Sequence, residues 1–539
     1  MEFRPGREQA LDRLFDYYQH AAALAQARLT RQTFPGPRSA APAAPSAAPS
    51  LEDAAQALAW ARTERDNLLA CLDHVTQVGQ HARVIALTAA LAELLRRDGP
   101  WVEAVTRHAA ALRSARQLGD RLREANALTF LGDARYMTDD YQGADRDLEQ
   151  AVALYRDLGD RLGQANAFAF LGDVRRLAAD YPAAARDLEQ ALALYSDIGD
   201  LLGQANAFTS LGDMWRLTGD YPGAVRDLEQ ALALYRDIGD LLGQANVLTR
   251  LGNVRQAGDY PGAARDLEHA LVLYREIGNR LGEANAISSL GEVRRQTSDY
   301  PGAVSDLERA LALYRDLGDR LGQANVLTSL GEVRRQTGDY PGATRDLEQA
   351  LALYGDISDR LGEANALTCL GDVRQQTGDY PGATGNLERA LVLYSDIGDL
   401  LGQANALTSL GIVRREIGDS TRAARDLEQA LVLYRDLGER SGEAGVLNES
   451  GTLHRVSGEL AQARECHQQA LELARAIASA WDEASALAGL GRCAIAVGQP
   501  VQAGALLRQA YEILQRIGAA DALSVLAELS ALTSPQAAQ

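Results

Sequence analysis

The feature that most constrains the fold is a unit of about 40 residues that recurs along most of the chain. The unit from Asp319 to Ser358 has close copies on both sides. Copies begin at Asp120, Asp160, Asp200, Asp240, Asn279, Asp359, Asp399 and Glu439, with more divergent units at Gln80 and Ser479. The unit from Asp240 is one residue short at residues 254–258, where we expect the deletion to change only a connection between helices. Eleven such units, from Gln80 to Gly518, predict a linear array.

Each unit predicts two amphipathic helices joined by a short turn. In the first helix, the apolar side comprises Ala324, Val326, Leu327, Leu330, Gly331 and Val333. In the second helix, a buried stripe comprises Ala343, Leu347, Ala350, Leu351 and Tyr354. Between them, Gly338 suits a helix end, Asp339 suits the next N-cap, and Pro341 is tolerated in a first turn. Because neither helix buries its apolar side alone, the hairpins must stack, and the predicted fold class is an all-α solenoid.

The spacing of Leu330-Gly331, Ala343, Leu347 and Ala350 resembles that of tetratricopeptide repeats, over roughly four-fifths of the chain. This resemblance implies a right-handed superhelix of about eleven helical hairpins, with the first helix of each hairpin on the concave surface. The unit is longer than the usual repeat of roughly 34 residues and is more similar to the long repeats of bacterial regulators. Arg334 and its equivalents stand where the family usually has an aromatic residue. Either adjacent hairpins pack more loosely there, or the arginine stem covers the gap.

The regions outside the repeats have a different character. Residues 1–30 predict an amphipathic helix, residues 31–50 a Pro/Ala/Ser linker, and residues 51–79 a helical segment before the repeats at 80–518. Residues 519–539 predict a capping helix and tail. The residues of this helix that should cover the last hairpin are Leu523, Val525, Leu526 and Leu529.

A short motif precedes the repeats. Trp60, Glu64, Arg65, Asn67 and Leu68, in the order W-x3-E-R-x-N-L, resemble the segment that leads into the repeats of bacterial STAND-type regulators. Such regulators bind nucleotide through a loop that requires a lysine, whereas all 54 basic residues of this chain are arginines. We therefore expect no cofactor and no ATP hydrolysis. The resemblance implies the sensor or partner-binding half of such a regulator, either encoded alone or cut from a longer protein.

Composition and motifs exclude several other functions. The net charge of −19 disfavours nucleic acid as a direct partner, and no apolar run is long enough to span a membrane. Four cysteines without paired spacing indicate a reducing, cytoplasmic location. No nucleophile, base and orienting group recur together, so we expect no enzyme. The cysteine and histidine residues of the last repeats lack metal-ligand spacing, and no metal site is predicted at His454, Cys466, His467 and Cys493.

The candidate site is a polar stripe along the first helices. An asparagine recurs there in each of eight units, and its amide can both donate to and accept from the backbone of an extended peptide. Acids and arginines lie beside it and are expected to pair, which would leave the groove polar but nearly neutral. The predicted site residues are Asn206, Asn246, Asn285, Asn325, Asn365, Glu292, Arg295, Glu332, Arg335 and Gln336.

Two questions stay open from the sequence. Near-identical units are typical of recent duplication, so each asparagine could instead hydrogen-bond the adjacent hairpin and hold the stacking register. The chain could be a scaffold or sensor that binds a partner protein or peptide in the concave groove, or a structural protein that assembles as a homo-oligomer. On the groove hypothesis, Asn325→Ala should spare folding, whereas Leu330→Asp should damage it by burying a charge.

Overall fold

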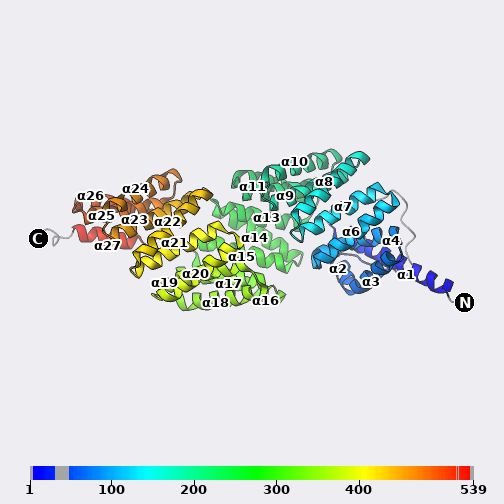
Figure 1. Ribbon diagram of the computed structural model, residues 1–539, viewed down its shortest axis with the longest axis horizontal. Helices are drawn as coiled ribbons and strands as arrows, with labels where there is room; N and C mark the ends of the chain where they lie inside the picture. Colours follow the sequence, from blue (N-terminus) through cyan, green and yellow to red (C-terminus); the bar gives the residue numbers. More distant parts are fainter. Residues whose placement is uncertain (1–3, 31–47, 518, 520, 534–539) are drawn as a thin grey trace. The chain divides into compact units, whose positions relative to one another are not determined.

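The computed structural model describes residues 4–30, 48–517, 519 and 521–533, and all regular elements in these residues are helices (Figure 1). The first helices are α1 (Arg4–Leu29), α2 (Ala54–Thr63), α3 (Arg65–Gln77), α4 (His81–Ala90), α5 (Ala92–Asp98) and α6 (Trp101–Leu118). The next are α7 (Arg121–Tyr136), α8 (Tyr141–Leu158), α9 (Arg161–Leu177), α10 (Tyr181–Ile198), α11 (Leu201–Leu217), α12 (Tyr221–Asp237), α13 (Leu241–Arg255) and α14 (Tyr260–Glu276). Then follow α15 (Arg280–Gln296), α16 (Tyr300–Leu317), α17 (Arg320–Gln336), α18 (Tyr340–Ile357), α19 (Arg360–Gln376), α20 (Tyr380–Ile397), α21 (Leu400–Glu416) and α22 (Ser420–Leu437). The last are α23 (Arg440–Val456), α24 (Leu460–Ala476), α25 (Ala480–Ala496), α26 (Pro500–Arg516) and α27 (Ala522–Thr533).

The helices pair into the predicted hairpins, and the fold is an α-solenoid. Each repeat from residue 120 onwards supplies one first helix and one second helix, from α7 with α8 to α25 with α26. In the repeat from Gln80 the first helix is interrupted at Leu91, which divides it into α4 and α5. Helix α1 lies within the predicted N-terminal segment, and α2 and α3 lie within 51–79. Most of the predicted linker, residues 31–47, lies outside the described residues.

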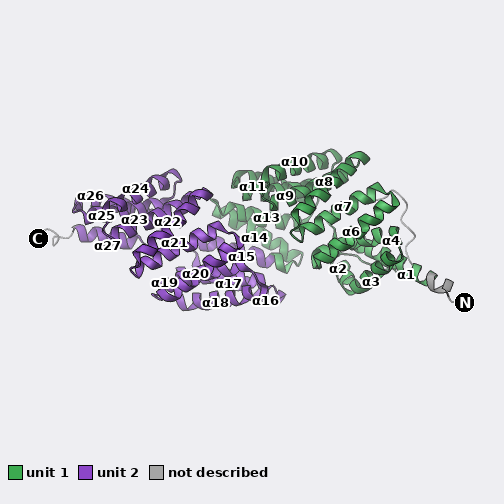
Figure 2. Cartoon of the chain, in the orientation of Figure 1, with its two compact units in different colours: residues 1–282 green, residues 283–539 purple. Residues whose placement is uncertain are grey.

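The contacts divide the chain into two compact units, residues 1–282 and residues 283–539 (Figure 2). The even spacing of the repeats does not indicate this division. Within each unit, successive first helices touch one another, as α7, α9, α11 and α13 do in unit 1 and α17, α19, α21 and α23 do in unit 2. The described second helices approach one another less closely. The first helices therefore form the more tightly spaced layer of each stack.

The turns form as the sequence predicts. Gly338 adopts a left-handed backbone with φ of 81° at the end of α17, a conformation that glycine accepts without strain. The carboxylate of Asp339 then caps α18 by accepting a hydrogen bond of 3.0 Å from the backbone N–H of Gly342. The residue missing from the repeat of Asp240 is lost at the end of α13, as expected, which stops at Arg255.

The core of the hairpin also agrees with the helical pattern. All six predicted apolar residues of α17 are buried. Gly331 allows α17 and α18 to lie close together, because a Cβ atom there would be 2.6 Å from Cγ of Leu347. Leu351 differs from the prediction, since it is only half-buried, while Asp346 on the same helix is buried.

The C-terminal helix caps the last hairpin only in part. Val525 and Leu529 of α27 are buried in a cluster with residues of α25 and α26. Leu523 and Leu526, which should also have covered this hairpin, are 74% and 39% exposed, so the prediction is wrong for these two. The described helices include none that is both long and apolar enough to cross a membrane.

Candidate functional site

Each recurring asparagine is hydrogen-bonded to a tyrosine of its own hairpin. Tyr354 of α18 donates its hydroxyl proton to Oδ1 of Asn325 on α17, at 2.7 Å. The same bond, between 2.5 and 2.8 Å, joins Tyr155 to Asn126, Tyr195 to Asn166, Tyr235 to Asn206, Tyr274 to Asn246, Tyr314 to Asn285, Tyr394 to Asn365 and Tyr434 to Asn405. The asparagine therefore links the two helices of one hairpin. We call these eight bonds the Asn–Tyr pairs.

The tyrosine extends this contact to the next hairpin. The ring of Tyr314 lies against Gly322 at the start of α17, where any Cβ atom would clash with it. Tyr314 is buried, as are its equivalents in the other repeats. The asparagine thus orients a ring that packs between two hairpins. Its effect on stacking is indirect, because the hydrogen bond itself stays within one hairpin.

Seven of the eight asparagines nevertheless lie at or near the surface of the first-helix layer, and only Asn166 is buried. Asn285, Asn325 and Asn365 are exposed, and Asn206 and Asn246 are half-buried. One turn before Asn325, Leu321 is 46% exposed, and Leu361 and Leu401 are exposed at the same position of the following repeats. The predicted stripe is therefore accessible, and in unit 2 apolar side chains accompany it.

The acids and arginines of the predicted stripe pair with one another, as expected. Arg335 donates to both carboxylate oxygens of Glu332, at 2.6 and 2.8 Å, and Gln336 donates to the same carboxylate at 2.9 Å. Arg295 and Glu292 form the same pair one repeat earlier. This part of the stripe is polar and locally neutral.

In unit 1 the first-helix layer borders a cavity of about 530 Å³. Its walls come from α7, α9, α11 and α13, and from α5 and the end of α1. Two predicted site residues, Asn206 and Asn246, line it. The other residues that matter for its chemistry are Phe130, Phe170, Asp133, Asp173, Arg96, Ser210 and Arg250. We call this space the unit 1 cavity.

These additional residues were not singled out from the sequence, although a signal was present. Phe130 and Phe170 occupy the helix position that holds Ser289, Ser329 and Ser409 in later repeats. In an array of near-copies, such departures mark the positions where one repeat is specialised. The predicted site residues lie instead in the repeats between residues 200 and 398, because the repeats near the C-terminal end are less uniform and have Gly445 and Ser485 in place of the asparagine.

The acids of the unit 1 cavity are partly removed from water. Asp133 is only 8% exposed, and its nearest cation is Nε of Arg96, at 3.4 Å. Burial raises the pKa of Asp133 to about 6, against the smaller lowering effect of Arg96. Burial likewise raises the pKa of Asp173, which lies 3.5 Å from Arg176 on the same helix. The next acid, Asp213, forms an ion pair with Arg250 of the following first helix.

A repeated set of ion pairs links successive hairpins. Arg334 of α17 forms an ion pair with the buried Asp346 of α18, and at 3.0 Å with Glu308 of α16 in the preceding hairpin. The equivalent arginines Arg175 and Arg414 make the same two kinds of contact, with Asp187 and Glu149 and with Asp426 and Glu388. The arginine at the usual aromatic position therefore bridges hairpins through its charge. We call these groups the Arg–Asp–Glu triads.

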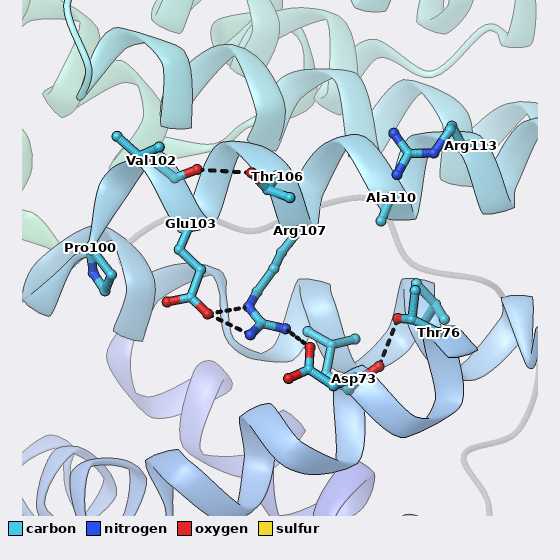
Figure 3. A pocket seen from close by; sticks show the side chains of 11 residues that line it. Asp73, Thr76, Pro100, Val102, Glu103, Thr106, Arg107, Ala110 and Arg113 are labelled. Carbon is cyan, nitrogen blue, oxygen red and sulfur yellow. Dashed lines mark hydrogen bonds and ion pairs between the residues drawn. The ribbon is translucent and has the colours of Figure 1, made fainter. Parts of the chain in front are cut away.

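A further hollow of about 590 Å³ lies between α3 and α6 (Figure 3). Arg107 lines this hollow and pairs with Glu103 at 2.5 Å and with Asp73 at 2.7 Å (Figure 3). Both carboxylates thus contact the one guanidinium, and the group keeps one net negative charge. None of the predicted site residues lines this hollow.

The W-x3-E-R-x-N-L motif has a structural role in this chain. Glu64, between α2 and α3, accepts hydrogen bonds from Tyr18 of α1 at 2.9 Å and from Asn67 at 2.8 Å. Arg65 donates to the backbone carbonyl of Gly99, before α6, and Leu68 is fully buried. The motif therefore holds α1, α3 and the start of α6 together.

The histidine and cysteine side chains of the last repeats do not come together as a metal site. Among the described residues, no group of three or more histidine, cysteine or acidic side chains is arranged to hold a metal ion. His467 is buried against Gly451 and Gly489, and its Nδ1 lies 3.1 Å from Oδ1 of Asn448. Burial lowers the pKa of His467 to about 4.

Comparison with solved structures found several proteins similar to this chain. The STAND protein with a tetratricopeptide repeat sensor from Pyrococcus horikoshii is 16% identical, with a TM-score of 0.48, over 67% of this chain and 53% of its own. The apo quorum sensor NprR from B. thuringiensis is 14% identical, with a TM-score of 0.45, over 67% of this chain and 99% of its own. A Rap protein complexed with Competence and Sporulation Factor is 14% identical, with a TM-score of 0.45, over 66% and 98%.

Sequence comparison is more direct. No curated protein matches the chain significantly. Five segments, residues 84–157, 203–276, 282–356, 362–436 and 442–516, match the tetratricopeptide repeat, and together they cover more than half of the chain. Arrays of this kind are generally non-catalytic and serve as scaffolds or sensors in protein interactions. The chain belongs to the tetratricopeptide repeat family.

Proposed function

We propose that the chain binds an extended segment of a partner protein along its first helices, with the unit 1 cavity as the main contact. The cavity is the observation that supports this most. Its volume of about 530 Å³ lies in the range typical of ligand sites, and its lining combines three aromatic residues, Phe130, Phe170 and Tyr235, with a mostly polar and charged wall. In helical-repeat proteins the concave side of the stack is the usual binding surface.

The lining residues suggest how a peptide would be held. Phe130 and Phe170 offer apolar surface for one or two of its side chains. Asn206 and Asn246 have their Oδ1 atoms bonded to tyrosines, so their amide N–H groups are the part suited to a peptide carbonyl. In this proposal each asparagine has two roles. Its Oδ1 atom holds the two helices of its own hairpin together, rather than bonding to the adjacent hairpin, and its amide N–H groups meet the ligand.

The proposed setting is a STAND-type regulatory system. The support for it is the W-x3-E-R-x-N-L motif directly before the repeats, at Trp60 to Leu68. Within such a system this chain would supply the sensor, and the nucleotide-binding activity would come from elsewhere. Its ligand would then be a peptide that acts as a signal or a segment of the regulatory partner.

The test uses two matched Ser→Arg variants. Ser210→Arg adds a long side chain to the cavity. The next repeat already has an arginine, Arg250 on α13, at the equivalent position. Ser305→Arg lies on the exposed side of α16. Other repeats already have an arginine at this position, namely Arg265, Arg345 and Arg425. Both changes therefore copy residues that this fold tolerates, and they alter the net charge equally.

Peptides selected from a random 12-residue display library would be measured against each purified protein by fluorescence anisotropy. We expect Ser210→Arg to weaken binding at least tenfold and Ser305→Arg to leave it within twofold of wild type. Equal binding to all three proteins would place the peptides outside the cavity and would refute the proposal.

A second candidate function is self-association through the C-terminal end. Leu523 and Leu526 of α27 remain exposed after α27 has packed on the last hairpin. Solenoids require polar ends to stay monomeric. On this alternative, sedimentation velocity would show mass rising with concentration for wild type and a constant monomer mass for Leu523→Lys. A monomer at all concentrations in both proteins would exclude it.

A further inference from the structure

We infer that the unit 1 cavity selects partner segments that carry an arginine or lysine side chain, which pairs with Asp173. This inference rests on the proposed function and specifies its ligand.

The chain itself contains an example of the pairing. Asp213 on α11 forms an ion pair with Arg250, which lies on α13, the next first helix. In the preceding repeat the same two positions hold Asp173 on α9 and Ser210 on α11. Ser210 is uncharged, so it supplies a hydrogen bond but no cation to the carboxylate of Asp173. The cation that completes this contact one repeat later is therefore absent for Asp173.

Asp173 is suited to receive that cation from a ligand. Its side chain is 33% exposed and lines the cavity, so a ligand can reach it. Its partners are Arg176, at 3.5 Å, and the hydroxyl of Ser210. The Arg176 distance is longer than the roughly 2.7–2.9 Å of a strong charge-assisted hydrogen bond. Burial raises the pKa of the carboxyl, and a second guanidinium would favour its ionised form.

The aromatic rings provide a matching environment for the stem of such a side chain. Phe130 and Phe170 lie one repeat apart on α7 and α9, and both line the cavity. Aromatic faces attract cations and also cover the methylene groups of arginine and lysine. The net charge of −19 adds a long-range attraction for basic segments, which raises the rate of encounter.

The experiment compares the composition and affinity of selected peptides. Random 12-residue display peptides would be selected on wild type and on Asp173→Asn, a change that copies Asn253 at the same position of α13. We expect peptides selected on wild type to be enriched in arginine or lysine at one position, and those selected on Asp173→Asn to lack this enrichment. Replacing that residue by citrulline or norleucine should weaken binding to wild type about tenfold or more, and hardly affect binding to Asp173→Asn.

The outcomes separate this inference from the proposed function. Peptides that lose affinity for Ser210→Arg but show no preference for basic residues would overturn the inference and leave cavity binding in place. Peptides that bind Ser210→Arg and wild type equally would overturn both. A failure to select any peptide would also count against both, because an extended ligand is then not what the cavity takes.

Discussion

The Asn–Tyr pairs lead to a prediction that differs from the expectation based on sequence. Asn325→Ala removes the atom that accepts the hydroxyl proton of Tyr354, whose side chain is buried. Leaving a buried donor without an acceptor costs about 1–3 kcal/mol. Thr328, whose Oγ1 lies 3.4 Å from the tyrosine hydroxyl, offers a weak replacement. We therefore expect a local destabilisation of about 1–2 kcal/mol rather than a neutral change.

Hydrogen exchange measured by mass spectrometry suits this test, because a long repeat array does not unfold in a single step. Peptides from residues 319–358 should exchange roughly 5 to 30 times faster in Asn325→Ala, which corresponds to the expected free energy. Tyr354→Phe removes the donor instead. Adding Asn325→Ala to that variant should then cost much less than it costs in wild type, because no buried hydroxyl remains to be satisfied.

Two results would contradict this reasoning. If Asn325→Ala leaves the exchange of these peptides unchanged, the hydrogen bond does not stabilise the hairpin, and the asparagine is free to serve a ligand alone. If the two single changes add fully in the double variant, the residues act independently despite their 2.7 Å contact.

Three further predictions concern other parts of the repeats. Asn386 replaces the aspartate of the Arg–Asp–Glu triads, and Arg374 is left with ion pairs of only 3.8 Å to Asp379 and 3.9 Å to Glu348. Asn386→Asp should therefore slow hydrogen exchange in α19 and α20. Unchanged exchange would show that the triads do not stabilise the stack. Gly331→Ala should destabilise its hairpin by about 1–3 kcal/mol through overpacking against Leu347, whereas Gly355→Ala, which meets no atom within 4 Å, should stabilise it by roughly 0.5–1 kcal/mol. Both effects would be measured by hydrogen exchange of peptides from residues 319–358. Burial lowers the pKa of His467 from 6.5 to about 4, so the folded state holds the neutral imidazole. The contribution of His467 to the free energy of unfolding is therefore fully present above pH 6.5 and is lost as the pH falls towards 4. The wild type should therefore lose more thermal stability between pH 7 and pH 5 than His467→Leu, in which leucine copies Leu427 and Leu507. Equal losses would show that the pKa of His467 is the same in the folded and unfolded states, so that burial does not lower it.

Much of the fold was predictable because its causes are local and repeated. The helical period of Ala324, Leu327 and Leu330, the cap at Asp339 and the turn at Gly338 involve residues only a few positions apart. Each of these sequence signals recurs in many units, so a misleading residue in one unit does not change the prediction. The same repetition also concealed part of the site, since Phe130 and Phe170 are departures from the pattern.

The contacts between polar side chains were harder to predict from the sequence. The sequence shows that Asn325, Glu332 and Arg335 face away from the core of α17, and the last two pair as expected because they are one turn apart. Tyr354, by contrast, lies 29 residues from Asn325, and Glu308 lies 26 residues from Arg334. Whether such groups meet depends on the angle and register between helices, which helical periodicity does not specify.

By itself, then, the amino-acid sequence determined the hairpin, its caps, its buried side and the stacking of copies into a solenoid. These follow from hydrogen bonding and burial within one unit and between identical neighbours. Only the tertiary structure decided that the asparagines bond to tyrosines, that arginines bridge successive second helices, and that Asp173 and two phenylalanines line one cavity with Asn206. Those contacts join residues from several helices, and their distances depend on how the hairpins pack in three dimensions.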